Sequence, residues 1–103
     1  GANIDLQNNG QGSALNAAAR NGHISTAKLL LAKGADVNGM TNGQGTPLMA
    51  ATKNQIYDMA DLLLENGADP YLSPGHQSSP NDIAHKKGNR KLIKLFRAYE
   101  KEY

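Results

Sequence analysis

The chain of 103 residues contains no cysteine and no tryptophan, and only five of its residues are aromatic. The absence of cysteine excludes a disulfide framework and a cysteine-ligated zinc site, and it is typical of proteins in a reducing compartment. No apolar run reaches the length of about 20 residues that a membrane-spanning helix needs. A core built mostly of leucine and alanine suits closely stacked short helices better than a β-sandwich or a β-barrel.

Positive charge is scarce in most of the chain, although the net charge is +2. Residues 1–84 hold four lysines and arginines against seven acidic residues, whereas residues 85–103 hold seven against two. The basic character therefore belongs to the C-terminal end. This distribution does not indicate a nucleic-acid-binding surface that extends over the whole domain.

The sequence repeats itself with a period of 33 residues. The segment Gly1–Asp5 returns as Gly34–Asn38 and again as Gly67–Tyr71. A fixed period of this length is typical of repeat proteins, in which each unit buries its apolar face against its neighbours. We therefore divide the chain into one domain of three units, 1–33, 34–66 and 67–103. The expected function is binding over a surface and not catalysis in a pocket.

The middle unit predicts a loop followed by two helices. Thr46 and the proline after it are typical of a helix start, because the hydroxyl accepts a free N–H and proline needs none. We expect helices over Pro47–Asn54 and Tyr57–Asn66. Gly34 fits a helix C-terminus that requires positive φ. In the third unit Ser79 takes the place of Thr46.

Equivalent positions of the three units predict the layers of the core. Small residues from the first helices and larger residues from the second helices recur with the 33-residue period. The expected layers are Leu15/Leu48, Ala17/Ala50/Ile83, Ala18/Ala51/Ala84, Ala27/Ala60/Ile93 and Leu30/Leu63/Phe96.

The two ends of the chain differ in character. We expect a long last helix, about Asn89–Glu102, with Arg90, Lys94, Arg97 and Lys101 along one side. A terminal repeat needs a polar outer side, so this helix is expected to cap the array. The N-terminal unit has no such polar substitution, and we expect the domain to be part of a longer array.

Three segments together resemble ankyrin repeats: Thr46–Ala51, Leu62–Leu64 and Gly34–Asn38. The resemblance covers the whole chain and implies an all-α ankyrin repeat solenoid, with three 33-residue units of finger loop plus helix-turn-helix and a C-terminal capping helix. The chain departs from the usual family pattern at two positions of each unit. Where the family usually has histidine, the chain has Asn16, Met49 and Asp82. Where it usually has glycine before the threonine, the chain has Gln11, Gln44 and Gln77.

A column of basic residues is the strongest candidate for a site. Arg20, Lys53 and Lys86 recur with the period at the end of each first helix, and we name them the basic column. The resemblance implies that this surface and the finger tips line a concave face that binds partners. We expect a partner segment with acidic residues. The expected partner-binding residues are Asn9, Gly10, Arg20, Asn21, Asn42, Gly43, Lys53, Asn54, His76, Lys86 and Lys87.

The sequence gives little support for catalysis. The three histidines are isolated from one another, and no combination of nucleophile, base and acid is evident. The glycine-rich segment Gly43–Pro47 lacks the lysine and the preceding strand of a phosphate-binding loop. We therefore expect no catalytic residues, no metal, no cofactor and no enzymatic activity.

The sequence favours a non-catalytic protein–protein interaction module of a larger intracellular scaffold or regulatory protein, in the cytoplasm or the nucleus. We expect a monomer that does not bind a membrane. Two alternatives remain. One is a nucleic-acid or chromatin contact through the basic C-terminal helix, and the other is an enzyme inhibitor of ankyrin type.

Overall fold

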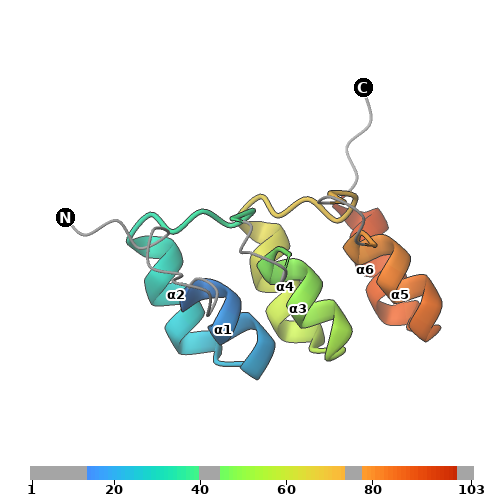
Figure 1. The fold of residues 1–103 in the computed structure, drawn as a ribbon, viewed down its shortest axis with the longest axis horizontal. Helices are drawn as coiled ribbons and strands as arrows, with labels where there is room; N and C mark the ends of the chain where they lie inside the picture. The colour runs from blue at the N-terminus through green and yellow to red at the C-terminus, as the bar shows by residue number, and fades with distance from the viewer. Residues whose placement is uncertain (1–13, 40–44, 74–77, 100–103) are drawn as a thin grey trace.

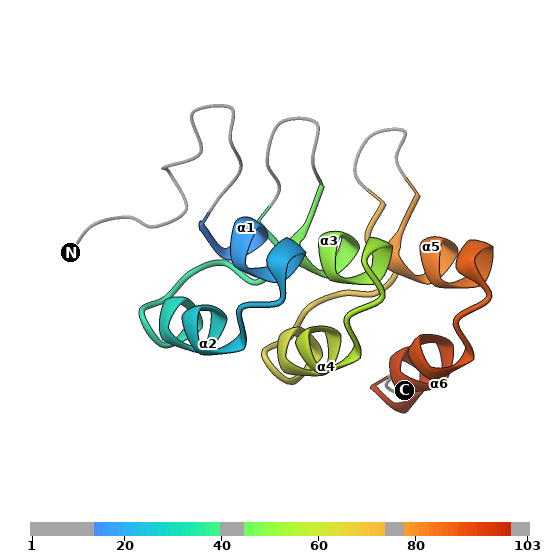
Figure 2. The same ribbon diagram turned by 90° about the horizontal axis from the view of Figure 1, so that it is seen from below.

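The computed structural model describes residues 14–39, 45–73 and 78–99 of the chain. Over these residues the fold is a row of three helix pairs (Figure 1). The first helices of the pairs form one layer and the second helices form another (Figure 2). The first layer contains α1 (Ala14–Asn21), α3 (Pro47–Lys53) and α5 (Pro80–Lys87), and the second contains α2 (Ile24–Ala32), α4 (Tyr57–Glu65) and α6 (Arg90–Ala98).

The order of the elements confirms the predicted loop, helix, turn and helix in each unit. Within the first layer α3 packs against both α1 and α5, and within the second α4 packs against both α2 and α6. The predicted ends of α3 and α4 are each one residue too long. The solenoid fold expected from the period is thus observed in the described part of the chain.

The last helix is shorter than predicted. The expected helix Asn89–Glu102 is wrong at both ends, because Asn89 is the N-cap residue and α6 ends at Ala98. The Asn89 side chain accepts a hydrogen bond from the Leu92 N–H (3.1 Å). At the other end the Tyr99 N–H bonds to the Phe96 carbonyl (3.2 Å), which closes a tight final turn. The helix therefore has nine residues, like α2 and α4.

Side-chain caps begin α3 and α5 as predicted. The buried Thr46 hydroxyl accepts the Met49 N–H (3.2 Å), and the Ser79 hydroxyl accepts the Asp82 N–H (3.1 Å). In return the Asp82 carboxylate accepts the Ser79 N–H at 3.3 Å. These bonds satisfy N–H groups that a helix leaves unpaired at its start.

Gly34 and Gly67 follow α2 and α4, the second helices of the first two units. Their φ angles are 97° and 95°, a region that residues with a Cβ atom rarely adopt. After α2, the Gly34 N–H bonds to the Leu31 carbonyl and the Ala35 N–H bonds to the Leu30 carbonyl. These two hydrogen bonds form a Schellman motif, and the same pair of bonds follows α4. The repeated glycine therefore reverses the chain toward the next unit.

The predicted layers are mostly buried. All members in the middle unit are buried, and Leu63 and Phe96 have no exposed surface. Ala17 and Leu30 in the first unit and Ile93 in the third are only half-buried. The three exceptions belong to the outer helix pairs, which have a described neighbour on one side only. The middle pair has a neighbour on both sides and holds most of the core.

Side-chain amides connect consecutive units. The Asn38 side chain donates to the Gly67 carbonyl (3.2 Å) and accepts the Asp69 N–H (2.9 Å). Asn16, at the position where the family usually has histidine, is buried and donates to the Gly45 carbonyl (3.2 Å). Each bond joins the backbone of one unit to a side chain of the unit before it. These contacts fix the spacing of the stack.

A tyrosine joins the third unit to the second. The Tyr99 hydroxyl donates a hydrogen bond to the Asp61 carboxylate (2.8 Å). This bond, with some desolvation and the negative charge of Asp61, raises the pKa of Tyr99 to about 12. The hydroxyl must keep its proton to donate, so the bond depends on pH.

Replacing Leu63 by alanine is expected to lower the free energy of unfolding by about 2–5 kcal/mol, because a cavity would form in the centre of the stack. Urea denaturation followed by circular dichroism measures this change. Leu29 of α2 is the control, because this leucine is 56 % exposed. Leu29→Ala should change stability by about 0.5 kcal/mol or less. Equal stability of the Leu63 variant and the parent would show that the assigned core is wrong.

Of the four tyrosines, Tyr99 is expected to ionise at the highest pH in an ultraviolet absorbance titration. In the unfolded chain Tyr99 has an ordinary pKa of about 10. The contribution of its hydrogen bond to stability is therefore complete below about pH 10 and is lost as the pH rises through about 12. Tyr99→Phe should remove the late transition, and Asp61→Asn should return it toward the ordinary value. Ionisation of all tyrosines near pH 10 in the parent would contradict the bond.

Candidate protein-binding face

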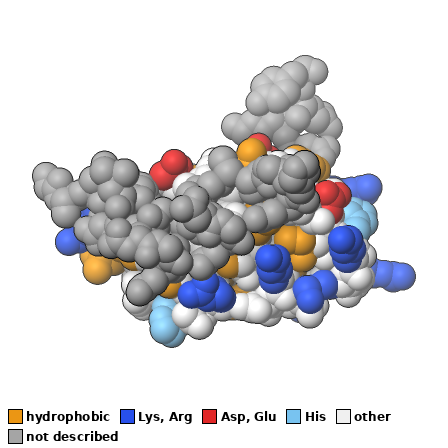
Figure 3. Space-filling model, in the orientation of Figure 1, with side chains coloured by type: hydrophobic (Ala, Val, Ile, Leu, Met, Phe, Trp, Pro, Cys, Tyr) orange, Lys and Arg blue, Asp and Glu red, His pale blue; other side chains and the backbone are white. Residues whose placement is uncertain are grey.

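The basic column lies along the layer of first helices. Arg20, Lys53 and Lys86 are exposed, and each lies in the last turn of α1, α3 or α5. Figure 3 shows lysine and arginine side chains recurring along this side of the molecule. We call it the first-helix face. Positive side chains at helix C-termini are favoured by the helix dipole, which accounts for part of their recurrence.

A groove opens on this face between α3 and α5. It brings together Lys53, Lys86 and Lys87, three of the predicted partner-binding residues. Met49, Ile83 and Ser78 complete its lining. Met49 is 1 % exposed and Ile83 is 6 % exposed, so their side chains form a largely buried apolar base beneath the long lysine side chains. We name this the inner groove.

The inner groove is electropositive. Its described lining holds three lysines and no carboxylate. Lys86 Nζ lies 3.5 Å from the Ser78 hydroxyl oxygen, a long contact that leaves the ammonium group exposed. Among the described residues, none of these three lysines forms an ion pair. The arrangement can therefore receive an apolar side chain together with flanking negative charge.

The other described candidates lie outside the inner groove. The Asn54 side chain donates to the Arg20 carbonyl (2.6 Å), so it joins the ends of α3 and α1. The Asn21 side chain donates to the Ala17 carbonyl (2.9 Å) within its own helix. Both amides thus have structural partners, although both residues are exposed. The bond from Asn54 also sets the distance between two members of the basic column.

Five of the predicted partner-binding residues cannot be placed on this face. They belong to the finger loops and lie outside the described residues: Asn9, Gly10, Asn42, Gly43 and His76.

Sequence reasoning did not identify the apolar base of the inner groove. Ile83 was expected only as a member of a core layer, and it is buried, but part of its side chain lines the groove. Met49 was noted only for replacing the usual histidine. Its sulfur lies 3.4 Å from the Thr46 nitrogen, and its side chain also reaches the groove. Both residues are buried in the stack and also line the groove, and the periodic pattern does not indicate the second role.

No group of three or more histidine, aspartate and glutamate side chains in the described segments is arranged to hold a metal ion. No helix in those segments has both the length and the apolar character needed to cross a membrane.

Comparison with protein families identifies the repeats. A sequence model described as ankyrin repeats (3 copies) matches residues 1–73. Comparison with curated protein sequences gave no match. Ankyrin repeats are generally protein–protein interaction modules and typically have no enzymatic activity. The family match covers well over half of the chain and includes the first two of the three stacked helix pairs, so this chain belongs to the ankyrin repeat family.

Proposed function

We propose that this chain is a non-catalytic interaction module that binds an acidic segment of another protein in the inner groove. The observation that carries this proposal is the convergence of Lys53, Lys86 and Lys87 over an apolar base. Positive charge attracts and orients the segment, and burial of an apolar side chain supplies most of the affinity.

The shape of the face supports an extended segment as the ligand. The groove lies between two helices of adjacent units, and Arg20 continues the positive charge toward the first unit. A segment that crosses α5, α3 and α1 would meet one member of the basic column in each unit. Carboxylates spaced along that segment would pair with them in turn.

The module is proposed to act within a larger intracellular scaffold or regulatory protein, as a monomer. A chain without cysteine is suited to a reducing compartment. The repeats offer a binding surface, and ankyrin repeats are generally protein–protein interaction modules. Both points favour recognition of a partner as the role of this domain.

Nucleic-acid binding through α6 is the weaker alternative. Arg90, Lys94 and Arg97 are exposed on this helix, but the two aromatic side chains at its C-terminal end are engaged. Phe96 has no exposed surface, and the Tyr99 hydroxyl bonds to Asp61. Base recognition needs groups that can stack on or bond to bases. The described part of α6 therefore favours at most a weak contact with phosphates.

Replacing Lys53 and Lys86 by glutamate is expected to weaken binding of acidic peptides by at least about tenfold. Peptides would first be selected against the parent chain from a random dodecamer library, and affinities then measured by calorimetry. Affinity in the parent should fall as salt rises from about 0.01 M to about 0.15 M, because the screening length shortens from about 30 Å to about 8 Å.

The matched control reverses the charge of two lysines that do not line the inner groove. Lys28 and Lys33 are exposed on and after α2, so Lys28→Glu with Lys33→Glu changes the net charge equally. This control should bind as the parent does. Equal losses in both double variants would mean that net charge alone attracts the peptides, and the inner groove would be rejected as their site.

Duplex DNA is expected to bind only weakly and to be released at about 150 mM salt, because few phosphates can be neutralised at once. Fluorescence anisotropy of a labelled duplex titrated with the chain measures this. Submicromolar, sequence-dependent affinity at that salt concentration would favour the nucleic-acid alternative over the peptide-binding one.

A further inference from the structure

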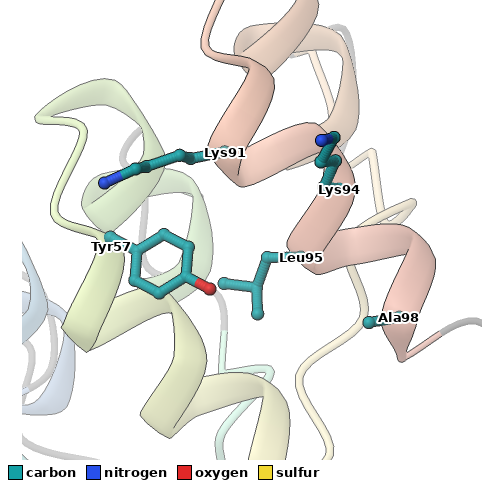
Figure 4. Close-up of a pocket in the computed structure, with 5 residues that line it drawn as sticks. All are labelled: Tyr57, Lys91, Lys94, Leu95 and Ala98. Atoms are coloured by element: carbon teal, nitrogen blue, oxygen red, sulfur yellow. The ribbon is translucent and has the colours of Figure 1, made fainter.

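A second groove lies between the second helices, on the opposite layer from the inner groove. Tyr57 of α4 lines one side, and Lys91, Lys94, Leu95 and Ala98 of α6 line the other (Figure 4). We name it the outer groove. It shares no lining residue with the inner groove.

The outer groove has an open aromatic wall. Tyr57 is 41 % exposed, which makes it one of the few large apolar side chains on the described surface. Figure 4 shows its hydroxyl end directed toward Leu95. Leu95 is mostly buried, and Ala98 leaves room further along α6. An apolar side chain placed here would contact the ring on one side and Leu95 on the other.

Two lysines border this apolar wall. Lys91 Nζ lies 6.0 Å from the centre of the Tyr57 ring, at the limit of a cation–π contact. Lys94 lies one turn further along the same helix, is exposed and forms no ion pair with the described residues. No carboxylate is among the described residues that line the groove. Both positive charges can therefore pair with an incoming negative group.

Charge also fixes the direction of an incoming ligand. The described part of α6 carries Arg90, Lys91, Lys94 and Arg97 and no acidic residue, whereas α4 carries Asp58, Asp61 and Glu65. Carboxylates of a ligand would be attracted to the α6 side and repelled from the α4 side. Asp61 is in addition occupied by the Tyr99 hydroxyl.

We propose that the outer groove is a second docking site, for a protein segment in which one large apolar side chain is flanked by carboxylates. The apolar side chain lies between Tyr57 and Leu95, and the carboxylates pair with Lys91 and Lys94. The two grooves face different sides of the stack, so the domain can hold two partner segments at once. This site is independent of the binding proposed for the inner groove.

An NMR titration tests this proposal with a defined probe, an acetylated and amidated peptide in which a leucine stands between two pairs of glutamates. Added to the full ¹⁵N-labelled chain, it should shift the amide signals of Tyr57, Lys94, Leu95 and Ala98 in a saturable manner. Tyr57→Ala and Lys94→Glu should each weaken this binding by about tenfold. Lys28→Glu, an equal charge reversal on α2, should leave it unchanged within about twofold.

A second peptide, with serine in place of leucine, separates docking from ionic attraction. It should bind the outer groove at least about tenfold more weakly. Equal binding of both peptides, or no shift at millimolar peptide, would overturn the proposal. So would shifts of the outer-groove signals with duplex DNA but not with the leucine peptide.

The variant Lys53→Glu with Lys86→Glu distinguishes the two grooves. The leucine peptide is also expected to shift the Met49 and Ile83 signals, because it is an acidic peptide of the kind proposed for the inner groove. The variant should abolish those shifts and retain the ones at Tyr57 and Leu95. Loss of the outer-groove shifts in this variant would overturn the second site, whereas loss of only the inner-groove shifts would leave it intact. Circular dichroism of each variant confirms that the fold is retained.

Discussion

The close contact between consecutive helix pairs is the constraint on which the whole structure depends. Ala18, Ala51 and Ala84 are small enough for the first helices to pack directly against one another. Leu63 and Phe96 fill the larger space between the second helices. Each pair alone would leave its apolar side in water, so it is stable only through its neighbours. The Asn38 side chain, bonded to two backbone groups of the next unit, holds the spacing.

This spacing also creates both grooves. A residue at the same position in each unit must lie on the same face, so the 33-residue period itself aligns the basic column. The inner groove results where α3 meets α5, and the outer groove where α4 meets α6. The two grooves differ because the units differ in sequence at the surface while they agree in the core. The repeat thus sets the core, and differences in sequence between the units set the lining of each groove.

The 33-residue period allowed most of the fold to be predicted, since it gave the helix pairs, the Thr46 cap and the buried layers. The end of α6 was predicted wrongly: the helix ends at Ala98, and the Tyr99 side chain beyond it bonds to Asp61 in the preceding unit. A non-repeated tertiary contact leaves no periodic signal. For the same reason the sequence indicated Lys53 and Lys86 but not Met49 and Ile83 beneath them. The role of Asn54 within the stack was likewise not evident.

The central claim is that the contact between adjacent units builds a partner site in the inner groove. The chain has three methionines, so labelling of their ε-methyl groups gives a simple NMR spectrum. Met49 lines the inner groove, whereas Met59 is fully buried. In a complex with a selected acidic peptide, nuclear Overhauser effects should connect peptide protons to the Met49 methyl group and not to the Met59 methyl group. A tight complex without any such contact to Met49 would contradict the account.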